Sequence, residues 1–448
     1  MSDFLTSLVA VVAVLGFMIL IHEFGHYAVA KLLGVRVEQF AIGFGKRLIG
    51  FRKGETDYRI NAIPLGGYVK MSGENPMDSR TDDPREFMNH SRWHRFLIAI
   101  AGPTMNILLA IFLLTTVYMV HYEYPVYVDK PAVIDGVRPG SPAALAGLQH
   151  GDRIIRVDDV TNPTWEQLEP KEWLSPNQPL TVTIQRGDQV FDKTIVPKPV
   201  TTSEVGSAGW FPEDPVVVGR VEAGLPAEKA GIQENDRIVA LDNQPVHSIE
   251  GVIDSLQRSK DQPIDLTVMR SGQTLHFRMQ PVLSKTEDPK EQRYRLGFSN
   301  KGETKVTTLP FAKALHLSLQ KNREYSLMIL ELAKKLVQHK ISLKAVSGPI
   351  GIAQEAGYAA QQKGWTPLME LTAGISLNLG IFNLLPIPIL DGGVILFLLI
   401  EGLMRRDISL NIKERVYQAA FVFLVLFAVM VIYNDLRKTI PGLADRLP

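Results

Sequence analysis

The chain has 448 residues, a formal net charge of +1 at pH 7 and no cysteine. A near-neutral chain has no basic excess to neutralise phosphates, which argues against a nucleic-acid-binding protein. Without cysteine, disulfides and thiolate ligands are excluded, so any bound metal has to be held by nitrogen and oxygen atoms. The length allows several domains.

The apolar residues are clustered in stretches that predict membrane-spanning helices. A helix needs roughly 20 apolar residues to cross the hydrocarbon core of a bilayer. The first stretch is expected to be retained rather than cleaved as a signal peptide, because Met1-Ser2-Asp3 is acidic and no A-x-A site follows. Val394–Ile400 is too short to cross and is expected to extend or follow the third span. The four predicted spans are Phe4–Leu33, Phe96–Val120, Pro367–Leu390 and Val416–Tyr433.

The first span carries the motif His22-Glu23-Phe24-Gly25-His26. Residues four apart lie on nearly the same face of a helix, so the two imidazoles can bind one metal ion. Glu23 lies next to them and can take a proton from a metal-bound water. A charged side chain at membrane depth costs about 2.5–3.5 kcal/mol. A buried metal site is therefore favoured over a polar patch that faces a neighbouring helix.

Lysine and arginine in the flanking segments predict the orientation of the spans. They are concentrated between the first and second spans and again before the fourth, so both segments are expected in the cytoplasm. Both termini and everything between the second and third spans then lie outside, in the periplasm of a bacterium, with the chain in the inner membrane. The basic residues are Lys31, Arg36, Lys46, Arg47, Arg52, Lys53, Arg92, Arg95, Arg405, Arg406, Lys413 and Arg415.

Val37–Met71 reads as short alternating strands around a Lys53-Gly54 turn, which predicts a β-hairpin region next to the first span. In one interpretation the hairpin dips into the membrane and offers a sheet edge to the backbone of a substrate. In the other it rests on the bilayer as an amphipathic hairpin. The pattern by itself leaves both open.

The polar segment between Tyr122 and Trp365 contains an internal repeat. Pro142 aligns with Pro226 and Asp152 with Asp236, a constant offset of 84 residues. Each copy has a short proline-initiated helix, a glycine stop and a strand, a pattern that resembles the PDZ domains of bacterial membrane and periplasmic proteases. Such domains capture peptides as an added strand. Peptide binding and restriction of access by bulk alone both remain open.

After the second copy, Leu309–Lys340 has apolar residues near helical spacing and basic residues on its polar side. This amphipathic helix either packs against the repeated domains as a connection or lies on the membrane surface.

The third span contains a candidate for a third metal ligand, because two histidines leave a catalytic zinc one protein ligand short. Asp391 follows Pro386 and Pro388, which cannot continue a regular helix and free backbone groups that a membrane tolerates only beside a cavity. Asp391 is thus an ionisable group that needs a partner at similar depth. The alternative is that Asp391 caps a helix before Gly392-Gly393.

HExxH in the first span and N-x-x-P-x-P-x-L-D-G-G in the third resemble the site-2 protease family of intramembrane zinc metalloproteases. Further matching motifs are Pro64–Met71, Ala101-Gly102-Pro103 with Asn106, and Ser347–Gly351. The resemblance implies that His22, His26 and Asp391 bind Zn²⁺ and that Glu23 is the general base. It also implies that Asn378 and Asn383, with the break at Pro386 and Pro388, help to hold an unwound substrate.

The predicted fold is a multi-pass α-helical membrane protein with four transmembrane helices, a membrane-associated β-hairpin region and two inserted periplasmic PDZ domains. The predicted divisions are 1–35 (first span with HExxH), 36–72 (hairpin region), 73–121 (cytoplasmic loop and second span), 126–204 and 205–300 (PDZ domains), 308–366 (amphipathic connecting helices), 367–404 (third span) and 412–448 (fourth span and tail).

The predicted function is intramembrane proteolysis, because a water activated by zinc and Glu23 can attack a peptide carbonyl. A helix hides its carbonyls in hydrogen bonds, so the substrate has to unwind locally. The expected substrates are single-span proteins that have lost their outer domain, with the PDZ pair as a size filter. The resemblance implies anti-sigma factors and remnant signal peptides in envelope-stress signalling. Alternatives are a membrane-anchored PDZ scaffold with a structural metal and a zinc-dependent transporter.

Overall fold

The computed structural model describes residues 3–74, 83–199, 205–285, 292–342, 348–362 and 364–439. Met1, Ser2, Ser347 and the tail after Thr439, which enter the sequence predictions, lie outside these ranges. The chain divides into two compact units. The helical unit comprises 1–121, 308–330 and 347–436, and the β-rich unit comprises 122–307, 331–346 and 437–448.

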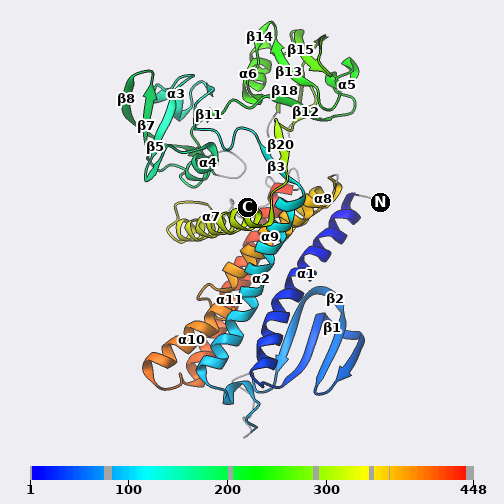
Figure 1. The fold of residues 1–448 in the computed structure, drawn as a ribbon, viewed down its shortest axis with the longest axis vertical. Coiled ribbons are helices and arrows are strands. Elements are labelled where there is room, and N and C mark those ends of the chain that lie inside the picture. The colour runs from blue at the N-terminus through cyan, green and yellow to red at the C-terminus, as the bar shows by residue number, and fades with distance from the viewer. Residues whose placement is uncertain are drawn as a thin grey trace. The chain divides into compact units, whose positions relative to one another are not determined.

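Long apolar helices dominate the helical unit. Among the described residues, three helices are long and apolar enough to cross a membrane, at Leu5–Leu32, Arg92–Val120 and Leu410–Arg437. They belong to α1 (Asp3–Leu32), α2 (Arg92–Val120) and α11 (Leu410–Thr439). These helices coincide with the first, second and fourth predicted spans. Helix α2 packs against both α1 and α9 (Figure 1).

The third predicted span, 367–390, does not form one helix. Helix α9 runs from Thr366 to Asn383, and α10 begins at Asp391 and ends at Met404. Residues 384–390 between them contain both prolines, as the predicted break requires, and Ile389 has a left-handed φ of 89°. Val394–Ile400 lies in α10 and so follows the broken span. Neither piece is one of the three long apolar helices.

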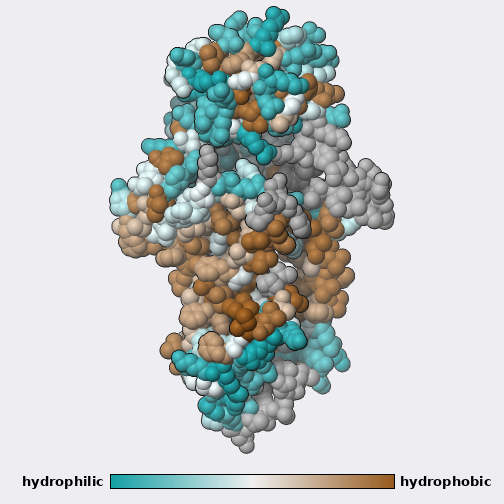
Figure 2. Space-filling model, turned by 90° about the vertical axis from the view of Figure 1, so that its right-hand side faces the viewer, coloured by the Kyte–Doolittle hydropathy of each residue, from teal (hydrophilic) through white to brown (hydrophobic). Residues whose placement is uncertain are grey.

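Hydrophobic residues cover much of the helical unit's surface in Figure 2, with hydrophilic residues at its lower end. An exposed apolar surface of this extent is unusual for a protein surrounded by water and suits contact with lipid. On α11 the exposed side chains include Phe421, Val422, Phe423, Leu426 and Val429.

The predicted hairpin is present and is more elaborate than a simple hairpin. Strands β1 (Val37–Lys53) and β2 (Thr56–Met71) each contribute two paired segments, because Ala41 pairs with both Tyr68 and Arg59. The segments lie in the order 47–53, 56–61, 39–42 and 67–71. Gly43 lies at a bend of β1 with φ +81°, where a Cβ would come within 2.4 Å of the Ile63 carbonyl oxygen.

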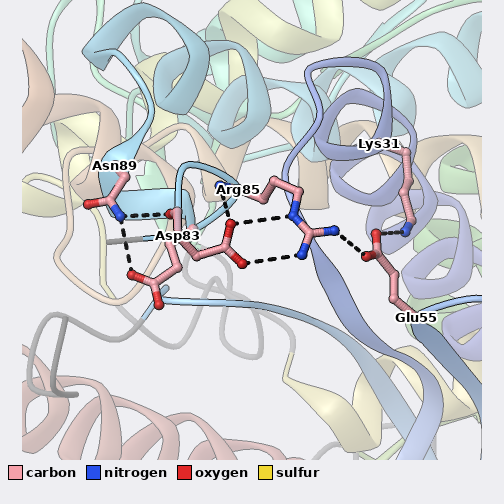
Figure 3. Close-up of polar contacts among 6 residues, drawn as sticks. Lys31, Glu55, Asp83, Arg85 and Asn89 are labelled. Carbon is pink, nitrogen blue, oxygen red and sulfur yellow. Dashed lines mark hydrogen bonds and ion pairs between the residues drawn. The ribbon is translucent and has the colours of Figure 1, made fainter. Parts of the chain in front are cut away.

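A polar network holds the turn of this sheet to its neighbours (Figure 3). Lys31 Nζ, at the end of α1, donates to Glu55 Oε1 at 2.9 Å, and Arg85 Nη1 donates to Glu55 Oε2 at 3.2 Å. Arg85 also pairs with Asp83 in the loop before α2. Exposed ion pairs contribute only about 0–1 kcal/mol each, so this network orients the turn more than it stabilises the fold.

The remaining elements of the helical unit are short or amphipathic. They are η1 (Phe87–Asn89), α8 (Pro349–Gln361) and the first part of α7 (Phe311–Val337), which continues into the β-rich unit. Helix α7 lies within the segment 309–340 where the sequence predicts an amphipathic helix. Its buried residues include polar Ser318 and Asn322 as well as Ala314, whereas Phe311 and Leu327 are exposed.

The β-rich unit contains two similar sheets. In the first copy the strand order is β6-β5-β7-β8, and in the second it is β16-β15-β13-β12-β19 with β14 beside β13. The first copy consists of β4 (Gly136–Val137), α3 (Pro142–Leu145), β5 (Arg153–Val157), β6 (Val160–Thr161), α4 (Trp165–Trp173), β7 (Leu180–Arg186), β8 (Gln189–Ile195), β9 (Lys198–Pro199), β10 (Gly206–Ser207) and β11 (Trp210–Phe211). The second consists of β12 (Val216–Val221), α5 (Pro226–Ala230), β13 (Arg237–Leu241), β14 (Gln244–Pro245), α6 (Ile249–Ser259), β15 (Ile264–Arg270), β16 (Gln273–Met279), β17 (Val282–Lys285), β18 (Gln292–Arg295) and β19 (Phe298–Asn300).

Each copy has its own hydrophobic core. Ile154, Leu168 and Ile184 are buried in the first, and Ile238, Leu256 and Leu266 in the second. Trp210 lies beyond the predicted boundary at 204, yet it belongs to the first core and pairs with Val137. The copies are preceded and followed by β3 (Tyr122–Pro125) and β20 (Thr304–Thr307), which pair with each other.

The repeat also extends to a buried ion pair. Asp152 is fully buried and accepts hydrogen bonds from Arg186 Nε at 2.6 Å and Nη2 at 2.7 Å. Asp236 and Arg270 make the same two bonds at the same distances. In both copies burial raises the pKa of the aspartate, but the hydrogen bonds and charge of the arginine, together with the backbone N–H of Gln149 or Gln233, leave the pKa below its usual value.

We predict that Arg186→Met and Arg270→Met each destabilise one copy, because each leaves a buried carboxylate without its partner. Breaking a buried pair in this way is strongly destabilising, and we expect a smaller loss of stability here because the arginines are partly exposed. Tryptophan fluorescence distinguishes the two copies, since Trp165, Trp173 and Trp210 lie in the first copy and no tryptophan lies in the second. The other two tryptophans, Trp93 and Trp365, lie in the helical unit and give the same background signal in both variants. Only Arg186→Met should shift that signal on thermal unfolding.

The same pairs predict a dependence on pH. Because the folded-state pKa of each aspartate lies below its unfolded value, the stabilisation is present above the unfolded pKa and is lost as the pH falls. The difference in free energy of unfolding between wild type and each variant should therefore become smaller at acid pH. If this difference stays the same at acid pH, the ionised carboxylates do not contribute to stability.

Candidate metal centre and catalytic site

Three side chains from two distant parts of the chain meet in the helical unit. His22 Nε2 lies 3.2 Å from Asp391 Oδ2, and His26 Nε2 lies 3.4 Å from Asp391 Oδ1. The two imidazole Nε2 atoms are themselves 3.2 Å apart. One ligand atom from each residue thus lies within 4.8 Å of the other two. The structure brings together the three ligands that the sequence predicts.

Local structure explains how each ligand is presented. His22 and His26 are one turn apart on α1 and both are buried. Asp391 is the first residue of α10, directly after the break. The helix cap is Leu390, and the Asp391 carboxylate lies against the histidines, so the alternative role of Asp391 as a cap is not what the structure shows.

Glycines make the close packing around these ligands possible. A Cβ on Gly392 would lie 2.2 Å from the Leu385 carbonyl oxygen, and one on Gly393 would lie 2.4 Å from that of Ile387. A Cβ on Gly102 of α2 would lie 2.3 Å from His26 Nε2. The glycine at 102 therefore leaves open the space on which the histidines converge.

The donor set suits zinc. Two imidazole nitrogens and one carboxylate oxygen are the usual three protein ligands of a catalytic zinc site, which keeps a fourth position for water or substrate. A closed structural site would need a fourth protein ligand. The space beside Gly102 and the three converging donor atoms therefore fit a catalytic rather than a structural ion.

Glu23 lies beside the ligands and is held from another element. Its Oε2 accepts a hydrogen bond from the backbone N–H of Val69 at 3.0 Å. Val69 belongs to the 67–71 segment of β2, the edge of the sheet that packs on α1. The sheet therefore fixes the orientation of the predicted general base.

The site opens into a cavity of about 530 Å³ in the helical unit. His22, Glu23, His26 and Asp391 all line it, as do Tyr68 and Val69 of the sheet. Its lining also includes a buried ion pair, in which Lys413 Nζ lies 2.6 Å from Glu401 Oε1. The cavity therefore combines apolar side chains with charged and polar groups that converge on it, as ligand-binding sites do.

The predicted substrate-binding residues are not all at this cavity. Asn383 lines it, at the end of α9. Asn378 is exposed and is not among the lining residues, because five residues along a helix place it on a different face. Pro386 and Pro388 lie in the break and are also absent from the lining, so their contribution is to end α9.

Several residues near the site have roles that the sequence patterns did not assign. Gly102 and Asn106 were singled out only as parts of a motif, yet both lie against the histidines. The N–H of Val69 lies beside Glu23 although nothing in its side chain indicates this. Gly102 and Asn106 are four residues apart on one helix, and this spacing could have indicated that both face the same neighbour.

Comparison with known proteins gives the family of the chain. Residues 10–427 match the model of Peptidase family M50. The chain is 34% identical over 462 residues to the regulator of sigma-E protease RseP of Salmonella typhimurium, covering 98% of this chain and 100% of the relative. It is 32% identical over 469 residues to the protein of the same name from Escherichia coli K12, with the same coverage. A Vibrio cholerae relative, whose name describes a zinc metalloprotease, is 34% identical over 482 residues, again with 98% and 100% coverage.

The chain therefore belongs to peptidase family M50, the site-2 proteases. It is a zinc-dependent metalloprotease, which confirms the enzyme class and the cofactor expected from the sequence. The scaffold and transporter alternatives are thereby set aside.

We predict that Gly102→Ala displaces His26 and weakens zinc binding by at least about tenfold, the scale on which changes beside metal ligands act. Gly16→Ala is the matched control, since it introduces the same methyl group on α1 where no atom lies within 4 Å. Zinc affinity is measured on both purified proteins by competition with a chelator. Equal affinities would show that the space beside Gly102 is not needed.

Proposed function

We propose that His22, His26 and Asp391 bind the catalytic zinc and that Glu23 is the general base for hydrolysis of peptide bonds within the membrane. The observation that supports this most is the meeting of three ligand atoms, one from beyond a helix break, beside Glu23 in one cavity. The long apolar helix α1, which carries His22, Glu23 and His26, supports a reaction at membrane depth.

When bound, zinc supplies a Lewis acid that polarises the carbonyl and lowers the pKa of a bound water to about 7. The Glu23 carboxylate takes the proton of the attacking water and passes it to the leaving amine. The Val69 N–H holds that carboxylate in place at 3.0 Å before the substrate arrives.

A transmembrane substrate has to unwind before its carbonyl can be attacked. Asn383 offers a donor and an acceptor to the backbone groups that unwinding frees, and its place in the cavity supports this role. The break after α9 leaves room beside the ligands because no helix continues through residues 384–390. Asn378, Pro386 and Pro388 then act on the substrate only indirectly.

The sheet offers a second means of holding an extended substrate. Its 67–71 edge adjoins the site, with Tyr68 and Val69 in the cavity lining. Such an edge can accept a substrate segment as an added strand. The exposed side chains of Leu48, Ile49 and Phe51 on the same sheet support contact with lipid, so the sheet dips into the membrane.

The substrates we propose are single-span proteins of the anti-sigma factor and remnant signal peptide types, cleaved in envelope-stress signalling after loss of their outer domains. The names of the relatives, which describe regulators of sigma-E, support this assignment. The two copies in the β-rich unit act as PDZ domains that exclude larger substrates. If α9, the break and α10 together cross the membrane once as a fourth span, the basic flanks support an inner-membrane chain with both termini and these domains in the periplasm.

We expect Glu23→Gln to abolish cleavage of a truncated single-span reporter while zinc content stays equal to wild type. Glutamine keeps the size of the side chain but cannot take the proton, and loss of a general base costs about 10²- to 10⁴-fold in rate. Glu414→Gln on α11, an exposed position, is the control and should cleave normally. Cleavage by Glu23→Gln at the wild-type rate would rule out the proposed base.

A second expectation separates the two asparagines. Asn383→Leu should lower kcat/KM for the same reporter by about tenfold, the effect of one lost hydrogen bond of about 1.4 kcal/mol. Asn378→Leu should have a smaller effect, because Asn378 does not line the cavity. A reporter with a helix-breaking glycine pair near its scissile bond should suffer less from Asn383→Leu. The reverse ranking of the two variants would contradict this assignment.

A further inference from the structure

The histidines are also held through their second ring nitrogens, and both contacts come from α2. His26 Nδ1 lies 2.8 Å from the carbonyl oxygen of Ile98. His22 Nδ1 lies 3.2 Å from Asn106 Nδ2. Outer partners of this kind set the tautomer and orientation of a metal-binding histidine.

The Ile98 contact defines the tautomer of His26. A carbonyl oxygen can only accept a hydrogen bond, so Nδ1 of His26 carries a proton, and in the neutral imidazole that binds a metal Nε2 keeps its lone pair. Nε2 is the atom that faces Asp391 in both histidines. For His22 to bind the same ion through Nε2, its own proton must also lie on Nδ1, and the group facing Nδ1 must accept it.

We propose that Asn106 is a positioning residue that accepts this proton through Oδ1 and so holds His22 in its zinc-binding tautomer. The inference rests on the proposed zinc site. Rotation of the side-chain amide by 180° exchanges Nδ2 and Oδ1 without moving the chain. In the described structure Oδ1 has no hydrogen-bond partner, so rotation breaks no existing bond of that atom.

The surroundings of Asn106 hold it in place beside His22. The residue is fully buried, and its backbone carbonyl accepts a hydrogen bond from Ser376 Oγ of α9 at 2.9 Å. A Cβ on Gly380 would lie 3.0 Å from the Pro103 carbonyl oxygen and 3.4 Å from Asn106 Cβ, so α9 lies close against α2 at this level. Asn106 therefore links His22 on α1 to the helix that leads to Asp391.

Asn106→Leu and Asn106→Asp separate this role from packing alone. Leucine has a similar size and cannot accept a hydrogen bond, whereas a carboxylate can only accept one. Thr115→Val is the control, because it removes a buried hydroxyl from the same helix. Among the described residues that hydroxyl donates to the Ile111 carbonyl, within α2 itself. Zinc affinity of each full-length protein in detergent is measured by chelator competition, and thermal unfolding of the zinc-free proteins monitors folding.

We expect Asn106→Leu to weaken zinc binding by about 10- to 100-fold, and Asn106→Asp and Thr115→Val to stay near wild type. In the zinc-loaded wild type, ¹⁵N NMR should show a slowly exchanging Nδ1 proton on His22, which Asn106→Leu should expose to exchange. Equal zinc affinity for Asn106→Leu and Thr115→Val, or loss of affinity in Asn106→Asp, would overturn the proposal. His22→Ala tests the site itself: wild-type affinity in that variant would refute the zinc site rather than the role of Asn106.

Discussion

The structure depends on bringing the Asp391 carboxylate against two imidazoles inside an apolar helical unit. Burying a carboxylate away from water is costly unless it is paired or binds a metal. The distances of 3.2 and 3.4 Å to the histidine Nε2 atoms supply that pairing. The break between α9 and α10 and the glycines at 392 and 393 follow from this requirement, because a continuous helix would carry Asp391 past the site.

Helix α2 contributes no metal ligand and yet organises the site. It packs against α1, α9 and α10, the helices that carry the site's residues. It supplies the Ile98 carbonyl to His26, Asn106 to His22 and the open space at Gly102. The sheet adds the Val69 N–H to Glu23 from the opposite side. The proposed ligands therefore lie on two helices but are oriented by elements around them.

The β-rich unit is stabilised independently of this centre. Each copy has its own core and its own buried aspartate–arginine pair, and neither depends on a residue of the helical unit. Such independence is what a pair of inserted domains needs if they are to act on a substrate without altering the catalytic groups. The identical geometry of the two pairs also shows that the repeat preserves a structural device and not only a helix and turn.

The sequence by itself determined the features that depend on residues close together in the chain. The four-residue spacing of His22 and His26, the apolar spans, the helix break at the prolines and the repeat offset all follow from local geometry. Tertiary structure alone decided that Asp391 meets the histidines in space and that Asn106 faces His22. It also decided that Asn383 reaches the cavity while Asn378 does not. The folding of the hairpin into a sheet of four segments was likewise decided there. Helix and strand periodicity reports which face a residue lies on, whereas the packing of α1, α2 and α9 determines which faces meet.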